Sequence, residues 1–218
     1  MSRRSLLAIA LALALVQSGC AAPARPTVEE LRKDYPLYEE NPLVQSARSS
    51  LRDYVATIPT GVLATITDHQ VLRLKNQGAD GSKAVPELEP LAFDYERYTL
   101  LVDTVIFGEN PGSEIDVYLP VLQNLPLQNI DRTPGNRFFY GLARYPSEKQ
   151  RQLETLLVCN GIPVNRPVFI GGSAVYWTRQ GYMLSAWPGP DNADFDLMTK
   201  AEFIKAIRTL REKAQDKP

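Results

Sequence analysis

The architecture follows from one run of the sequence, Tyr98-Thr-Leu-Leu-Val-Asp-Thr-Val-Ile-Phe107, which leads through Gly108 into Glu109-Asn-Pro-Gly-Ser113 and then Glu114-Ile-Asp-Val-Tyr-Leu119. The first part is rich in β-branched and large apolar residues, which favours a strand. Pro111 presets one dihedral angle of a turn, and Gly112 permits the positive φ that follows. In the last part apolar residues alternate with other residues, so we predict a hairpin whose second strand buries one face.

The segments on both sides of this hairpin also predict strands. Upstream, the alternation that begins at Val62 continues to Leu74, which indicates a strand or a bent strand pair before a polar surface loop at 76–83. Downstream, four further segments are strand-like: 137–144, 167–170, 174–178 and 182–187.

Helix signals precede these strands. Thr27-Val-Glu-Glu30 has the spacing of a capping box and predicts a brief helical turn that Pro36 stops. Asn41 followed by Pro42 is a good helix start, and apolar residues then recur at helical spacing, so we predict a helix near 42–56.

Two more helices are predicted later in the chain. Ser147-Glu-Lys-Gln150 has capping-box spacing and favours a short helix to about Val158, unless Asn160-Gly161 is a hairpin turn between two strands. Thr199-Lys-Ala-Glu202 is a capping box that opens a closing amphipathic helix. The predicted fold is α+β: a small curled antiparallel sheet or partly open barrel with an N-terminal helix, one inserted helix and a C-terminal helix.

The hairpin run from Tyr98 to Tyr118 resembles a strand-turn-strand unit of poorly characterised bacterial surface proteins, and small OB-like barrels share its general look. In that unit the hydrophobic strand ends in a Lys-Gly or similar pair, whereas Phe107 precedes Gly108 here. The resemblance implies a small β-barrel or OB-like domain and brings no catalytic residues with it.

The N-terminus has the composition of an export signal. Arg3 and Arg4 give a positive start, and Leu6 to Val16 form an apolar run without charge, glycine or proline. Because a helix rises about 1.5 Å per residue and the hydrocarbon core is about 30 Å thick, so short a run suits a signal better than a permanent span. We therefore expect an exported bacterial protein.

The end of this signal, Gln17-Ser-Gly-Cys20, resembles the lipobox cut by the bacterial lipoprotein signal peptidase. Ser18 and Gly19 fit the family, and Gln17 stands where Leu, Val or Ile is usual. The resemblance implies cleavage before Cys20, diacylglycerol on its thiol and uptake of palmitate. The alternative is an ordinary secretory signal cut near Ala22 or Ala24.

These features divide the chain into a signal peptide at 1–19, a lipid attachment and tether with a short helical turn at 20–40, and a single α+β domain at 41–218. Cys159 is the other cysteine. If Cys20 carries lipid, we expect Cys159 to be a small buried apolar residue rather than a reactive thiol; a Cys20–Cys159 disulfide is the competing use.

Charge argues against several partner classes. Removing residues 1–19 takes two of the 24 basic side chains and none of the 25 acidic ones, which leaves a formal charge of −3. A near balance without a clustered basic face predicts no nucleic-acid partner, and the sequence has no polybasic segment for anionic lipid. There is also no Gly-rich phosphate loop, paired-cysteine zinc motif or dinucleotide fingerprint, so we expect no cofactor.

Candidates for catalysis are few. His69 is the only histidine, and a lone histidine beside an acid is usually a surface or turn residue. Ser173 follows Gly171-Gly172 as in a nucleophile elbow, but the closing glycine is missing, so it is expected in a turn. Asp103 and Asp116 lie on neighbouring predicted strands and form the alternative, a carboxylate-dependent hydrolase. We assign no catalytic residues.

The candidate binding surface lies near the C-terminus. Aromatic residues that could stack on sugars or dock a partner cluster on one predicted hairpin: Tyr176, Trp177, Tyr182 and Trp187. Core packing is their competing use, and a binding role predicts that Trp177 or Trp187 is substantially exposed. The loop that follows carries the carboxylates of Asp191, Asp194 and Asp196. Its spacing departs from an EF-hand, so we expect a solvated loop and no metal.

Together these patterns predict a membrane-tethered, extracytoplasmic lipoprotein domain of the cell envelope. It would face the periplasm or the cell exterior and bind a protein or glycan without catalysis. The exported hydrolase is the alternative, and a two-domain solute receptor is disfavoured because alternating βαβ units are missing.

Overall fold

The structure is a computed structural model of the 218-residue chain, and it describes residues 25–37, 50–88, 92–121, 133–189 and 191–216. The predicted signal and Cys20 lie outside the described residues. So does the first half of the helix predicted near 42–56.

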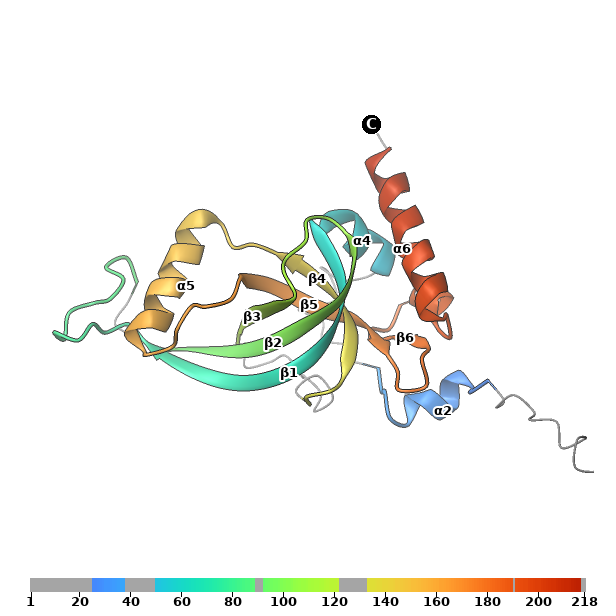
Figure 1. The fold of residues 1–218 in the computed structure, drawn as a ribbon, viewed down its shortest axis with the longest axis horizontal. Coiled ribbons are helices and arrows are strands. Elements are labelled where there is room, and N and C mark those ends of the chain that lie inside the picture. The colour runs from blue at the N-terminus through green and yellow to red at the C-terminus, as the bar shows by residue number, and fades with distance from the viewer. Residues whose placement is uncertain (1–24, 38–49, 89–91, 122–132, 190, 217–218) are drawn as a thin grey trace, which may run out of the picture.

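Five strands close into a barrel (Figure 1). The barrel strands are β1 (Thr60–Lys75), β2 (Ala92–Phe107), β3 (Glu114–Pro120), β4 (Arg137–Ala143) and β5 (Val168–Trp177), and the sheet has one further strand, β6 (Met183–Ser185). β1 pairs antiparallel with β2 and β4, β2 with β3, and β4 with β5. A parallel contact between β3 and β5 completes the ring, and β6 is added to β5. The predicted α+β fold with a small curled sheet is confirmed, and the barrel is closed rather than partly open.

The hairpin of β2 and β3 forms at the predicted place, with Leu100 opposite Ile115. Gly112 has a φ of 105°, as the turn requires. The expectation that β3 buries one face is wrong, because Ile115 through Tyr118 are all buried. Ile115 and Val117 belong to the barrel core, whereas Tyr118 packs in a second cluster beneath a helix.

The helices are α2 (Val28–Arg32), α4 (Leu51–Thr57), α5 (Ser147–Cys159), α6 (Lys200–Gln215) and a 3-10 turn, η2 (Asn192–Phe195). Capping boxes open α2 and α6 as predicted. The capping box predicted for α5 is wrong, because Pro146 occupies the N-cap and Ser147 is already helical. The alternative of a hairpin turn at Asn160-Gly161 is also wrong, since Asn160 is the C-cap of α5.

The apolar core has two parts. The larger part fills the barrel and extends outward to Leu31 of α2, Val55 of α4 and Phe203 of α6. The smaller part lies where β1 and β2 continue past the barrel, and Leu156 of α5 covers Leu74 there. As a result α2, α4 and α6 gather at one end of the molecule and α5 lies at the other (Figure 1).

Candidate functional site

The candidate aromatic residues divide between the core and the surface. Tyr176 is fully buried, and its ring centroid lies 5.3 Å from that of Phe138. Trp187 is only 7% exposed and packs edge-on against Tyr54. Trp177 is half-buried. The expectation that Trp177 or Trp187 is substantially exposed is therefore not met, and core packing accounts for two of the four rings.

Two cations lie over the half-buried Trp177. The Arg137 guanidinium carbon is 4.0 Å from the ring centroid and the Lys200 ammonium is 4.5 Å away, both within cation–π range. The fold explains the meeting, because Arg137 opens β4 beside the end of β5, and a bridge between Tyr182 and Thr199 brings the start of α6 to the same place. These cations compete with any sugar that would stack on the indole.

A second cation–aromatic pair adjoins the first. Arg25 lies 5.2 Å from the Tyr182 ring centroid and donates a hydrogen bond to the Leu197 carbonyl. Arg179, which is exposed, anchors its backbone N–H on the Tyr35 hydroxyl at 2.9 Å. We call this set the cation–aromatic surface, and it consists of Arg25, Arg137, Trp177, Arg179, Tyr182 and Lys200.

The cation–aromatic surface carries excess positive charge. None of its four cations forms a salt bridge with another described residue. One nearby carboxylate is Glu202, whose pKa is held below its usual range by hydrogen bonds from the Thr199 amide and hydroxyl and by the charge of Arg25. Lys200 lies in the first turn of α6, where the helix dipole favours an acid instead. The local arrangement is therefore suited to a negatively charged partner.

The acidic loop beside this surface has a structural role. Asp196 accepts hydrogen bonds from the Ser185 amide at 2.6 Å and from Arg32 of α2 at 3.2 Å. Asp194 pairs with Arg52 of α4 at 2.8 Å, and Asp191 lies 3.9 Å from the same guanidinium. The three carboxylates thus point to arginines on two helices. Within the described ranges, no group of three or more His, Cys, Asp or Glu residues is placed to hold a metal ion.

The histidine is part of a buried polar cluster. His69 Nε2 lies 3.3 Å from a carboxylate oxygen of Glu96, which is 2% exposed. The Tyr98 hydroxyl donates to the same carboxylate oxygen, and the Tyr98 and His69 rings lie 4.8 Å apart. In the part of the chain that the structure describes, no serine, threonine or cysteine is hydrogen-bonded to His69. The cluster joins β1 to β2 and lacks the nucleophile of a triad.

The two candidate acids of a hydrolase are held apart. Asp116 is buried and accepts a 2.8 Å hydrogen bond from Thr99, its cross-strand neighbour on β2. Asp103 lies four residues further along β2 and accepts a hydrogen bond from Thr65. At about 3.3 Å per residue this offset is about 13 Å, beyond the roughly 5 to 9.5 Å that separates paired glycosidase carboxylates.

Two other expectations need correction. Ser173 is not in a turn, because it lies within β5 opposite Tyr140. Cys159 is exposed rather than buried, since it ends α5 beside Val158, which is 61% exposed and lies outside the cluster beneath that helix.

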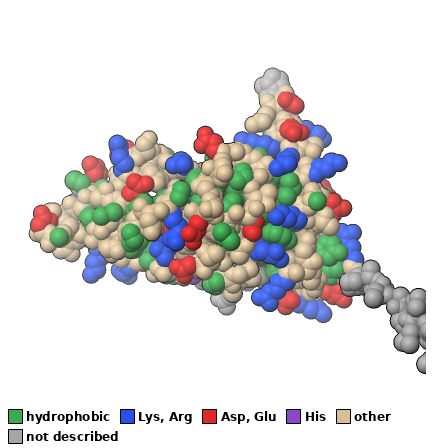
Figure 2. Space-filling model, in the orientation of Figure 1, with side chains coloured by type: hydrophobic (Ala, Val, Ile, Leu, Met, Phe, Trp, Pro, Cys, Tyr) green, Lys and Arg blue, Asp and Glu red, His purple; other side chains and the backbone are tan. Residues whose placement is uncertain are grey.

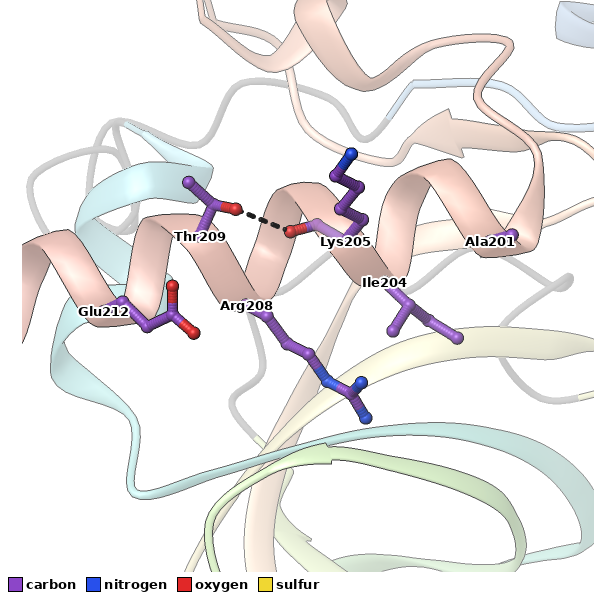
Figure 3. A pocket seen from close by; sticks show the side chains of 6 residues that line it. All are labelled: Ala201, Ile204, Lys205, Arg208, Thr209 and Glu212. Carbon is purple, nitrogen blue, oxygen red and sulfur yellow. Dashed lines mark hydrogen bonds between the residues drawn. The ribbon is translucent and has the colours of Figure 1, made fainter.

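A shallow hollow runs along α6 (Figure 3). It has a volume of about 480 Å³, and its lining residues within the described ranges all belong to α6: Ala201, Ile204, Lys205, Arg208, Thr209 and Glu212. Ile204 and Arg208 point toward the strands below, where Arg208 Nε donates to the Ile106 carbonyl at 3.0 Å. Ligand sites usually enclose most of the ligand with groups from several elements, so this hollow is better explained as the seam that joins α6 to β2.

Sequence reasoning found Trp177 and Tyr182 but missed the cations that surround them. Arg25, Arg137 and Lys200 come from three distant segments, and only the fold brings them together. Figure 2 shows Lys and Arg side chains on the face over α6 and its surroundings, with acidic side chains interspersed. A basic surface of this kind leaves no run of positive charge along the chain.

No family model, no curated protein and no solved structure matches the chain. Among the helices of the described residues, none combines the length and the apolar character needed to cross a bilayer. Function therefore rests on the sequence signals and on the geometry above.

Proposed function

We propose that this protein is an exported bacterial lipoprotein whose small β-barrel domain is tethered by Cys20 to the outer face of a membrane and acts by binding rather than by catalysis. One observation carries the proposal: Ser18-Gly-Cys20 resembles a lipobox and ends only five residues before Arg25, which contacts the barrel domain. This short spacing supports a domain that lies close to its anchor.

The way in which α2 docks supports a tether rather than a long free linker. Leu31 and Tyr35 are buried in the barrel core. Arg32 donates to the Ser185 carbonyl at 2.6 Å and to the Ser185 hydroxyl at 3.0 Å, in addition to its bond with Asp196. Because this segment is packed against the barrel, a lipid anchor just before it stays close to the barrel.

The closed five-stranded barrel supports the OB-like resemblance, and barrels of that kind serve as binding modules. The positive cation–aromatic surface supports a binding role as well. The proposed partner is a protein or a glycan of the cell envelope. The occupied faces of Trp177 favour a partner with negative groups over a neutral sugar.

Palmitate labelling of bacterial cells tests the anchor. The full chain is compared with Cys20→Ser and with Cys159→Ser, which removes the other cysteine and is the matched control. The proposal predicts label for the parent chain and for Cys159→Ser, both in the membrane fraction, and no label for Cys20→Ser. An unlabelled parent chain in the soluble extracytoplasmic fraction would instead indicate a secretory signal cut near Ala22 or Ala24.

Crosslinking on intact cells tests the binding half of the proposal. The captured molecules are identified and compared between the parent chain and a variant with Arg137→Gln and Lys200→Gln. A partner that is captured through this surface should be lost from the variant. Turnover of envelope substrates that disappears in an Asp116→Asn variant would favour the hydrolase instead.

A further inference from the structure

We propose that the cation–aromatic surface contacts the phosphate groups of anionic phospholipids in the membrane to which the protein is anchored. The inference rests on the proposed function, because the anchor supplies the membrane. It assigns to Arg25, Arg137, Arg179 and Lys200 a role in orienting the barrel on the bilayer.

The length of the tether places this surface next to the lipid. Arg25 is five positions after Cys20, and a fully extended chain spans at most about 3.6 Å per residue, so the two residues lie within about 18 Å of each other in any conformation. Arg25 is in turn held against Tyr182 and the Leu197 carbonyl. The side of the domain that carries the cation–aromatic surface is therefore held next to the membrane by the tether.

The chemistry of the surface matches a phospholipid headgroup. An arginine guanidinium can bind a phosphate through two parallel hydrogen bonds, and a lysine ammonium adds a point charge. The Arg137 side chain donates a hydrogen bond to the Thr178 carbonyl at 3.0 Å and keeps further donors for a ligand. Trp177 and Tyr182 are half-buried rings with polar atoms, the type of side chain that is enriched at membrane interfaces.

The net charge of the chain means that the cation–aromatic surface binds an anionic bilayer only when it is held close to it. The mature chain is slightly acidic, so it has no long-range attraction to an anionic bilayer. The four cations of this surface form no salt bridge with another described residue, and their attraction acts only over about one Debye length, which is about 8 Å at physiological salt. A tether that holds the surface near the bilayer raises its effective concentration there and makes this short-range attraction useful.

The test uses the chain from residue 20 onward, as the proposed cleavage leaves it, with Cys20→Ser, so that neither the apolar signal run nor an acyl chain contributes to binding. Co-sedimentation is measured with phosphatidylcholine vesicles that contain or lack phosphatidylglycerol, at low and high salt. We expect binding to the phosphatidylglycerol vesicles that weakens as salt rises. Each cation near the surface contributes about fivefold to the partition coefficient, so Arg137→Gln with Lys200→Gln should lower it about 25-fold.

A matched control removes the same charge elsewhere. Lys205→Gln with Lys213→Gln changes two exposed lysines of α6 outside the cation–aromatic surface and should leave the partition coefficient within about twofold. A second pair, Arg25→Gln with Arg179→Gln, repeats the test without altering the contacts of Trp177. Thermal unfolding of each variant establishes that it is folded.

Three results would overturn the inference. These are equal binding to both kinds of vesicle, equal losses in the test and control variants, and binding of inorganic phosphate alone without preference for phosphatidylglycerol vesicles, which would assign the surface to a free anion. Because the assay contains no lipid anchor, its failure leaves the palmitate result standing. A failed palmitate experiment likewise leaves the vesicle result standing.

Discussion

Replacement of Arg32 by methionine should release α2 from the barrel. The change keeps most of the apolar stem and removes the guanidinium that bonds to Ser185 and Asp196. Burial lowers the pKa of Arg32 while the Asp196 charge opposes the effect, and an arginine stays charged at neutral pH in any case. A hydrogen bond to a charged group contributes about 1.5 to 3 kcal/mol. We expect the free energy that docks α2 on the barrel to fall by about 2 to 3 kcal/mol in total, because the bonds share one guanidinium and are not additive.

Hydrogen exchange of the α2 amides measures this loss where it occurs. The Leu31 and Tyr35 amides donate to backbone carbonyls within this segment. A loss of 2 to 3 kcal/mol corresponds to exchange that is about 30- to 150-fold faster if the segment opens locally. The rest of the barrel should keep its protection.

Arg52→Met is the matched control for this prediction. Arg52 also pairs with an acid of the η2 loop, Asp194, but both side chains are about half exposed. Exposed ion pairs contribute about 0 to 1 kcal/mol, so the control should change stability little. If Arg32→Met accelerates exchange no more than Arg52→Met does, the guanidinium does not hold α2 and the argument for a docked tether fails.

Three other variants test separate parts of the structure. Phe203→Ala should lower the free energy of unfolding by about 3 to 5 kcal/mol in urea titration, because the ring is fully buried against Phe139; a loss below about 1 kcal/mol would contradict this packing. Glu96→Ala should cost about 3 kcal/mol by leaving His69 and the Tyr98 hydroxyl without their buried partner, while Glu96→Gln should cost less; equal losses would argue against the cluster. Glu202→Gln should be less stable than the parent chain at neutral pH, because the lowered pKa of Glu202 means that its carboxylate stabilises the fold above the unfolded pKa. This difference should shrink as the pH falls below about 4, and a difference that grows in acid would refute it.

Local signals in the sequence predicted the local elements well. The capping boxes of Thr27 and Thr199 and the turn at Gly112 depend on residues within a few positions of each other, and all three form. The closing helix follows from its capping box and amphipathic spacing, and the hairpin of β2 and β3 follows from its β-branched residues and its turn. Ser147 shows the limit of such signals, since a proline before it takes the capping position.

Features that depend on contacts between distant segments could not be predicted from the sequence. The parallel pairing of Asp116 with Val168 closes the barrel across some fifty residues of chain, and no local pattern encodes it. The meeting of Arg137 and Lys200 at Trp177 depends on that closure and on the docking of α6. This is why the sequence showed no basic segment although the fold assembles a positive surface.

The most direct test of the membrane-tethered lipoprotein is the mass of its N-terminal peptide, measured on protein extracted from the membranes of bacterial cells. The account predicts a mature chain that begins at Cys20 and carries diacylglycerol on its thiol. A mature chain that begins after Ala22 or Ala24 and carries no lipid would contradict it.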